Sequence, residues 1–358
     1  MKLNTKKLIT FLSVYFLSLI TVCLVFVFLI SNLKIPEEIK FINSASSPIL
    51  ASPSPPPLAS PSPAPKISLI TTGDVGLVRT VNYQTSQMGP RYPFEKTADL
   101  LKNADLTLIN LEGPLIDNCP ITNEEMIFCG DKKNVEGLVF SGVDIANLAN
   151  NHIDNYGQEG IDQTLQILKE NRIDYIGLDN ILIKEIKGVK IAFLGFNFVG
   201  GLGNSQQVAG QVKQAKNLAN LVIVSFHWGD EYVFEPNDLQ IELAHLAIDN
   251  DADLIIGHHP HVVQTIEEYK GKLIVYSHGN FIFDQMWSLE TQQGIVGKYT
   301  FSDNKLVDYE FIPIQIENYS QPRILEGEGA KQVLEKLCVS QGGFGPPTYC
   351  LEGSRSIP

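Results

Sequence analysis

The 358-residue sequence is short of cysteine and of basic residues, and each shortage excludes a class of protein. Five cysteines are too few for a disulfide-dense secreted scaffold. Basic residues number 27 against 40 acidic ones. Five Lys and two Glu fall in the first 65 residues, which leaves 22 basic and 38 acidic side chains, a net charge of −16, for residues 66–358. A region this acidic lacks the basic field that attracts nucleic acid, so we expect no nucleic-acid partner.

One long apolar run, residues 8–30, contains no charged side chain. Its 23 residues match the roughly 20 that a helix needs to cross hydrocarbon. Lys2, Lys6 and Lys7 precede the run, so the positive-inside bias predicts a cytoplasmic segment 1–7, a single-pass transmembrane anchor and an extracytoplasmic remainder at the cell membrane. The alternative is a cleaved signal peptide, but its apolar core is usually about 7–15 residues long and a small-residue cleavage site follows it. The flank at 31–34 has no such site.

Residues 31–65 are predicted to form a stalk rich in Pro, Ser and Ala. The unit Leu-Ala-Ser-Pro-Ser-Pro occurs at 50–55 and again at 58–63. Proline fixes φ and removes backbone donors, which favours an extended polyproline-like chain. About 20 such residues at roughly 3.1 Å each would span about 60 Å between membrane and globular domain. A plain disordered linker would behave in nearly the same way.

Four cysteines, an even number, lie beyond the apolar run. This fits an exported domain, in which disulfides form and persist. Four cysteines allow three pairings. We favour the two short loops Cys119–Cys129 and Cys338–Cys350, and the absence of zinc-ribbon spacing favours disulfides over metal ligation.

From residue 66 onward, short apolar strands alternate with helices, and the 44% hydrophobic content allows a sizeable packed core. Helical spacing of apolar residues runs through 157–172 and 239–248. The predicted strands are 67–72, 106–111, 143–148, 190–196, 221–226, 253–256, 273–276 and 307–316. Near-continuous apolar strands indicate sheets buried on both faces by helices. The fold class is therefore α/β, with one domain over 66–320 and a C-terminal extension of the same domain over 321–358.

Polar side chains gather where these strands end. Six of the seven histidines lie just past a predicted strand, namely His152, His227, His258, His259, His261 and His278. Asp74, Asn110, Glu112 and Asn151 occupy the same kind of position. Ligands of open α/β sheets bind beyond the carboxyl ends of strands. Each residue alone has an ordinary explanation as a helix cap, a turn or a buried histidine. Together they predict a site for one or two divalent ions such as Mn, Fe or Zn, because calcium would favour oxygen donors alone.

The order of these motifs resembles that of the bacterial capsule-synthesis protein CapA family, associated with poly-γ-glutamate, within the calcineurin-like metallophosphoesterase superfamily. The resemblance covers about residues 66–316. The motifs that carry it are 72–75 (TGDV), 110–113 (NLEG), 149–152 (ANNH), 226–229 (FHWG), 257–264 (GHHPHVVQ) and 276–281 (YSHGNF). The resemblance implies a two-sheet sandwich flanked by helices, and the anchor and stalk also look like that family.

The resemblance also implies roles for single residues. Glu112 would bridge two metals and help to generate the nucleophile, with His152 beside the substrate as the second catalytic residue and proton donor. The other implied ligands are Asp74 and His261 for one metal, and Asn151, His227 and His259 for the other. As substrate contacts we expect Arg79, Asn110 and His278, although Arg79 could instead be an ordinary surface arginine.

One departure from the superfamily pattern concerns the first metal. The superfamily places a histidine ligand two residues after the first aspartate, and here that position is Gly76. The bridging aspartate is also replaced by Glu112, a change shared by CapA-like proteins. Both changes weaken the first metal position, so a mononuclear site held by Glu112, Asn151, His227 and His259 stays open.

Two functions of different class follow from these residues. The first is a metal-dependent hydrolase of metallophosphoesterase type that acts on an anionic cell-envelope polymer, such as poly-γ-glutamate, or on a phosphoester. The second is a non-catalytic, polymer-binding accessory of a membrane capsule-synthase complex. A purely structural envelope protein would leave the His259-Pro260-His261 turn and the Asn151-His152 pair unexplained.

Overall fold

A computed structural model describes residues 64–122, 126–338 and 354–356 of the chain. The predicted cytoplasmic segment 1–7, the anchor 8–30 and all but the last two residues of the stalk 31–65 lie outside the described residues. Among the residues that are described, no helix is both long enough and apolar enough to cross a bilayer.

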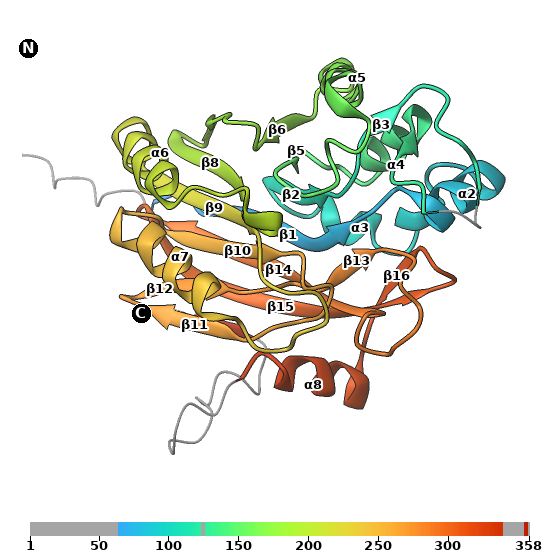
Figure 1. Ribbon diagram of the computed structural model, residues 1–358. Coiled ribbons are helices and arrows are strands. Elements are labelled where there is room, and N and C mark those ends of the chain that lie inside the picture. The colour runs from blue at the N-terminus through green and yellow to red at the C-terminus, as the bar shows by residue number, and fades with distance from the viewer. Residues whose placement is uncertain (1–63, 123–125, 339–353, 357–358) are drawn as a thin grey trace, which may run out of the picture. The chain divides into compact units, whose positions relative to one another are not determined.

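Two large sheets dominate the described part of the chain (Figure 1). The larger sheet contains β1 (Ile67–Val75), β2 (Leu106–Leu111), β5 (Ile145–Asn147), β6 (Asp174–Ile176), β13 (Asn280–Ile282), β14 (Gln293–Ser302), β15 (Lys305–Glu317), β16 (Gln321–Ile324) and β17 (Ser354–Ser356). The second contains β7 (Leu182–Ile186), β8 (Val189–Asn197), β9 (Leu221–His227), β10 (Leu254–His258), β11 (Ile266–Tyr269) and β12 (Lys272–Val275). A small separate pair is formed by β3 (Leu115–Ile116) and β4 (Gly130–Asp131).

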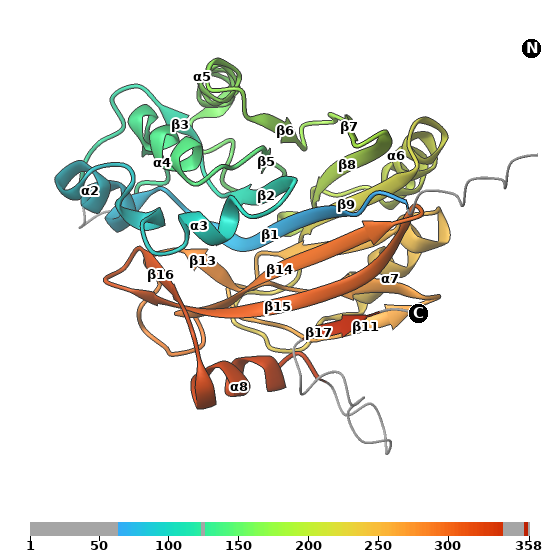
Figure 2. The same cartoon turned by 180° about the vertical axis from the view of Figure 1, so that it is seen from behind.

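Helices flank the two sheets. They are α2 (Arg79–Met88), α3 (Ala98–Leu101), α4 (Val135–Phe140), α5 (Gly157–Glu170), α6 (Ser205–Leu218), α7 (Asp238–Asp249) and α8 (Gly327–Glu335), with 3-10 turns η1 (Tyr92–Phe94), η2 (Lys132–Asn134) and η3 (Val199–Gly201). In Figure 1, α6 and α7 lie on one side of the sheets and α2, α3 and α4 on the other. The view from behind shows β1, β14 and β15 running side by side (Figure 2).

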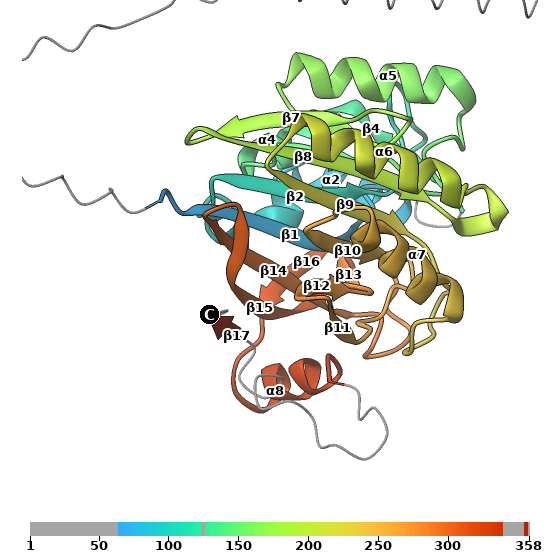
Figure 3. The same ribbon diagram turned by 90° about the vertical axis from the view of Figure 1, so that its left-hand side faces the viewer.

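The alternation of side chains along each strand builds three apolar layers. On β9, Leu221 and Ile223 face the core between the sheets, whereas Val222 and Val224 pack in the core that includes α6 and α7. A third core joins the outer face of the larger sheet to α2, α4 and α5. The order of layers is therefore helix, sheet, sheet, helix (Figure 3). The mixed α/β fold is confirmed, but the expectation of helices on both faces of a sheet was wrong. Each sheet has the other sheet on its inner face, and an apolar run cannot tell which partner covers it.

The strand register brings the predicted polar residues together. In the larger sheet, β1 runs parallel to β2 and β13, and Asp74 is paired with both Asn110 and Asn280. In the second sheet, β9 runs parallel to β10, and His227 is paired with His258. These residues all lie at the carboxyl ends of their strands or at the first residue of β13, so one edge of the sandwich collects them.

The cysteines bear out one of the two predicted pairs. Cys119 and Cys129 form a disulfide, which closes the loop between β3 and β4. Cys338 is a free, half-buried thiol, and Cys350 lies outside the described residues, so the Cys338–Cys350 pair is not seen.

The C-terminal segment packs against the rest of the domain: Leu325, Val333 and Leu337 lie in the core between the sheets.

Candidate metal centre

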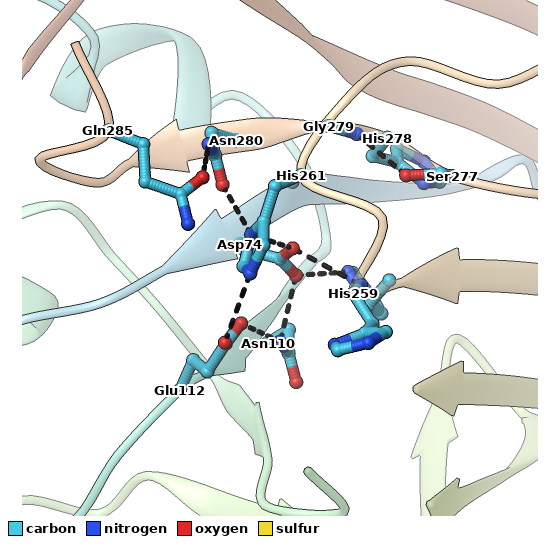
Figure 4. A network of polar contacts seen from close by, with 12 residues as sticks. Asp74, Asn110, Glu112, His259, His261, Ser277, His278, Gly279, Asn280 and Gln285 are labelled. Carbon is cyan, nitrogen blue, oxygen red and sulfur yellow. Dashed lines mark hydrogen bonds and ion pairs between the residues drawn. The ribbon is translucent and has the colours of Figure 1, made fainter. Parts of the chain in front are cut away.

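Asn110 organises two buried carboxylates at the ends of β1 and β2 (Figure 4). Its Nδ2 donates to Asp74 Oδ1 at 2.9 Å and lies 3.4 Å from Glu112 Oε2. Asn147 in β5 donates in turn to Asn110 Oδ1 at 3.1 Å. All four side chains are fully buried. The amide of Asn110 therefore fixes the orientation of both carboxylates.

The end of β10 and the turn after it carry three histidines toward these carboxylates. His258 Nδ1 lies 3.2 Å from Asp74 Oδ1, and His261 Nδ1 lies 3.2 Å from Asp74 Oδ2. His261 Nε2 is 3.6 Å from Glu112 Oε1. The backbone N–H of His259 donates to Asp74 Oδ2 at 3.2 Å. Asp74 is thus the common partner that holds the turn in place.

His227 and Asn151 complete the cluster from β9 and from the segment after β5. His227 Nε2 lies 2.8 Å from Asn151 Oδ1, and the rings of His227 and His259 are 4.8 Å apart between centroids. The structure therefore gathers every predicted metal ligand into one cluster: Asp74, Glu112, Asn151, His227, His259 and His261.

The buried atoms of this cluster fit a divalent ion. Glu112 Oε1 and His259 Nδ1 are buried without a hydrogen-bond partner, which is rare for polar atoms in a native interior. Asp74, Glu112 and His227 offer ligand atoms within 4.8 Å of one another. Carboxylate oxygen together with imidazole nitrogen is the donor set of Mn, Fe or Zn sites. The group could therefore hold a metal ion.

Burial and mutual charge set the protonation of the cluster. Burial raises the pKa of Glu112 to about 8, and the charge of Asp74 adds to this while His261 opposes it. Burial would lower the pKa of His261, but Glu112 and Asp74 outweigh it and raise the value to about 9. Burial lowers the pKa of His227 well below its usual value and that of His259 to about 4, with neighbouring histidines adding to both shifts. His227 and His259 are therefore neutral at pH 7, as metal ligation requires.

The pKa of Asp74 is lowered, in contrast to that of Glu112. Burial would raise its pKa, but hydrogen bonds from His258 and His261 outweigh burial and hold the pKa well below its usual value. Asp74 is the permanently ionised member of the group.

His152 lies at the open side of the cluster. Its ring stacks on Phe128, with centroids 3.8 Å apart and planes 6° from parallel. Its Nδ1 lies 2.8 Å from Asn155 Oδ1, and its Nε2 is 3.9 Å from Glu112 Oε1. His152, Phe128, Asn155 and Tyr156 line a cavity of about 310 Å³. Burial lowers the pKa of His152. The ring is held between the cluster and this cavity.

Arg79 is not the surface arginine that the alternative reading describes. It is 9% exposed, its guanidinium forms an ion pair with Asp284, and it lies over the rings of Phe128 and Phe283 at 4.6 and 5.1 Å. Asp284 therefore offsets the charge of Arg79, whose Nε is buried without a hydrogen-bond partner.

His278 and Asn110, the other two expected substrate contacts, are fully buried. His278 Nε2 lies 2.9 Å from Thr71 Oγ1 and 3.1 Å from the Tyr299 hydroxyl, and its Nδ1 lies 3.3 Å from Gly257 O. Burial, with the charge of His258 adding, lowers the pKa of His278 to about 3. Both ring nitrogens face protein groups, so the geometry leaves no nitrogen free for a substrate.

Three residues near the cluster had no role assigned from the sequence. Asn147 supports Asn110, and Asn280 Oδ1 lies 2.9 Å from His261 Nδ1. Both stand in strands that end or begin at the cluster, which is the signal that could have found them. A carboxylate oxygen of Glu231 lies within 4.8 Å of ring nitrogens of His259 and His261. Glu231 is an exposed acidic residue in a loop, so no strand end pointed to it in the sequence.

Comparison with known proteins gives a family match and curated relatives. The model of the family described as "Bacterial capsule synthesis protein PGA_cap" matches residues 68–285. The chain is 31% identical to "Capsule biosynthesis protein CapA" of Bacillus anthracis, over 76% of this chain and 72% of that protein. It is 32% identical to "PGA biosynthesis protein CapA" of Bacillus subtilis, over 74% and 76%.

Two more distant likenesses complete the comparison. A "Probable polyglutamine synthesis accessory protein" of Mycobacterium tuberculosis is 25% identical over 60% of this chain and 65% of that protein. Among solved structures, a hypothetical protein from Thermus thermophilus is 15% identical with a TM-score of 0.49, over 70% of this chain and 100% of that one. A likeness of this size carries no functional assignment.

Proposed function

The chain belongs to the PGA_cap family of bacterial capsule synthesis proteins, and from that membership we propose that it serves the synthesis or export of an anionic capsule polymer such as poly-γ-glutamate. Two relatives named CapA support this role, because the chain matches about three quarters of each. Family membership does not distinguish an enzyme from a polymer-binding protein, so this distinction depends on the residues of the site.

We propose that the domain is a metal-dependent hydrolase of an anionic polymer or a phosphoester. The observation that carries this proposal is the buried Glu112 Oε1 without a hydrogen-bond partner, beside Asp74 and the imidazoles of the cluster. Asp74, Glu112, Asn151, His227, His259 and His261 would hold one or two ions of Mn, Fe or Zn. When bound, such ions supply Lewis-acid polarisation of an oxyanion and activation of water.

Two other side chains would have separate roles in the reaction, one in positioning the carboxylates and one in proton transfer. Asn110 keeps Asp74 and Glu112 in fixed orientations, so that no reorganisation is needed during the reaction. His152 Nε2 would give a proton to the leaving oxygen, while Asn155 holds the other ring nitrogen. The lowered pKa of His152 makes its protonated ring a stronger acid, but it also reduces the protonated fraction at pH 7.

A non-catalytic accessory of a membrane capsule synthase is the second candidate. The printed name of the Mycobacterium tuberculosis relative, which calls that protein an accessory, favours it. The two candidates differ in one measurable respect, which is whether the polymer becomes shorter.

The purified full chain, loaded with Mn²⁺, is expected to shorten poly-γ-glutamate or to release phosphate from an aryl phosphoester. The measurement is polymer length by size-exclusion chromatography and phosphate release, each with and without a chelator. Turnover that chelation abolishes and Mn²⁺ restores would support the hydrolase. Polymer retained by the protein at unchanged length, without phosphate release, would support the accessory instead.

We further propose that the protein is held in the cell membrane by residues 8–30, with its main domain outside the cytoplasm and beside other capsule-synthase subunits. The Cys119–Cys129 disulfide supports this location, because disulfides persist mainly in oxidising compartments. The full chain is expected to stay in the membrane pellet after alkaline carbonate washing, and external protease should cleave it within the stalk. Release by carbonate, or protection from external protease in intact cells without an outer barrier, would contradict this topology.

A further inference from the structure

Glu231 lies at the rim of the candidate metal centre, in the loop between β9 and α7. It is an exposed residue, yet its ligand atom lies within 4.8 Å of ligand atoms on His259 and His261. The loop is fixed to the histidine turn by backbone hydrogen bonds: Tyr232 N donates to Pro260 O at 2.9 Å, and Trp228 N to His258 O at 3.1 Å. The side chain of Glu231 therefore starts from a backbone that is tied to the turn on both sides.

The backbone on both sides of this contact is strained. His259 has φ 96°, His261 has φ 57° and Tyr232 has φ 64°, values in the left-handed region that residues with a Cβ rarely adopt. Such conformations persist where the surroundings enforce them, and they gather at ligand-binding sites. Here they occur at His259 and His261 and at Tyr232, the residue next to Glu231.

One nitrogen at this point has no partner. His259 is 4% exposed, and its Nδ1 is buried without a hydrogen bond. A desolvated ring nitrogen without a partner is costly, so its presence points to a ligand that the protein is built to receive.

The position two residues after Asp74 offers no further ligand. A Cβ at Gly76 would lie 2.7 Å from the Phe283 ring, so no ligand side chain can stand at that position. Divalent Mn, Fe and Zn are bound through four or more donors. A carboxylate for the ion beside His259 and His261 can come from Glu231, an acidic residue whose ligand atom lies close to both histidines.

We propose that Glu231 is a metal ligand supplied from the rim, which joins His259 and His261 around one divalent ion. This inference rests on the proposed metal centre. Metal–ligand bonds of about 2.1 Å allow ligand atoms up to roughly 4.2 Å apart, so separations near the 4.8 Å limit of this group would have to shorten on metal binding. Glu231 can make this movement because its side chain is exposed.

The test is a Mn²⁺ titration of the metal-free full chain, followed by calorimetry and by electron paramagnetic resonance. Glu231→Gln removes the carboxylate charge and keeps the size. Glu235→Gln is the matched control, because Glu235 is an exposed carboxylate in the same loop. Wild type and Glu235→Gln are expected to bind two equivalents, whereas Glu231→Gln should bind one unchanged and the other at least about ten-fold more weakly.

The outcomes separate this inference from the proposed function. Two equivalents with the same affinity in wild type and Glu231→Gln would overturn the role of Glu231 and leave the metal centre standing. No Mn²⁺ bound to the wild type would overturn both. If the wild type binds a single ion, that ion must weaken in Glu231→Gln for the inference to survive. Equal melting temperatures of the three proteins in chelator would show that a loss of binding is not a loss of folding.

Discussion

Replacing His152 with alanine is expected to lower turnover by about 10²- to 10⁴-fold while the metal content stays unchanged, because a positioned proton donor contributes that much to catalysis. His152 Nε2 lies 3.9 Å from Glu112 Oε1, beside the cluster and facing a cavity of about 310 Å³. The ring is held by its stack on Phe128 and by Asn155. Loss of the ring therefore removes a proton donor and leaves the expected metal ligands in place.

The measurement for His152→Ala is kcat on whichever substrate the wild type turns over, beside metal content by elemental analysis. His245→Ala is a suitable control, because His245 is half-buried in α7 and its contacts are Glu267 and Tyr269. Equal polymer output from cells that carry wild type and His152→Ala would remove the catalytic role. A loss of metal in His152→Ala would instead make His152 a ligand or a support of one.

Each of the eight predicted strands overlaps a strand of the structure, because their side chains are apolar on both faces, but others such as the ten-residue β14 were not predicted. The segment 221–226 was expected as a strand, and β9 covers Leu221–His227. The sequence could not predict which element covers each face of a strand. Leu221 and Ile223 pack against the other sheet, whereas Val222 and Val224 pack against helices, although all four side chains are apolar. Packing partners are set by tertiary arrangement, which periodicity does not encode.

The candidate site was predictable to the extent that it lies at strand ends. Parallel strands bring their carboxyl ends to one edge of a sheet, so Asp74 had to lie near Asn110 in one sheet and His227 near His258 in the other. Which of the polar residues face the ligand was not predictable, since this depends on partners far away in sequence. His278 is engaged by Thr71 and Tyr299, and Arg79 by Asp284 more than 200 residues later. Glu231 was missed because a loop carries no strand-end signal.

Replacing Glu112 with glutamine is expected to weaken Mn²⁺ binding at both ions of a two-metal centre, the largest loss of affinity for any single change. Glu112 Oε1 is buried without a hydrogen bond and lies 3.6 Å from His261 Nε2. Asn110 holds the other oxygen, Oε2, at 3.4 Å. A glutamine amide has the same size, but it offers no anionic oxygen. The measurement is Mn²⁺ stoichiometry and affinity by calorimetry.

The pH dependence gives this prediction a second signature. The raised pKa of Glu112, about 8, means that Mn²⁺ must displace a proton from the carboxyl at pH 7. Below that pKa the proton competes with the metal. Protonation of Glu112 should therefore lower the wild-type affinity for Mn²⁺ by about ten-fold for each unit by which the pH falls. Glu112→Gln should lose this part of the dependence. Glu267→Gln, a half-buried carboxylate that accepts from the Tyr276 hydroxyl, should keep both the stoichiometry and the slope.

The metal-free stability of Glu112→Gln separates a lost ligand from a damaged fold. In the absence of metal, the raised pKa of Glu112 leaves its buried carboxyl protonated and neutral at pH 7, as a glutamine amide also is. The variant should therefore melt in chelator at about the wild-type temperature. Added Mn²⁺ should then stabilise the wild type much more than the variant, because only a bound ligand shifts the folded population. Equal stabilisation of both proteins by Mn²⁺ would exclude Glu112 as a ligand. Metal binding would then not explain why Glu112 Oε1 has no hydrogen-bond partner.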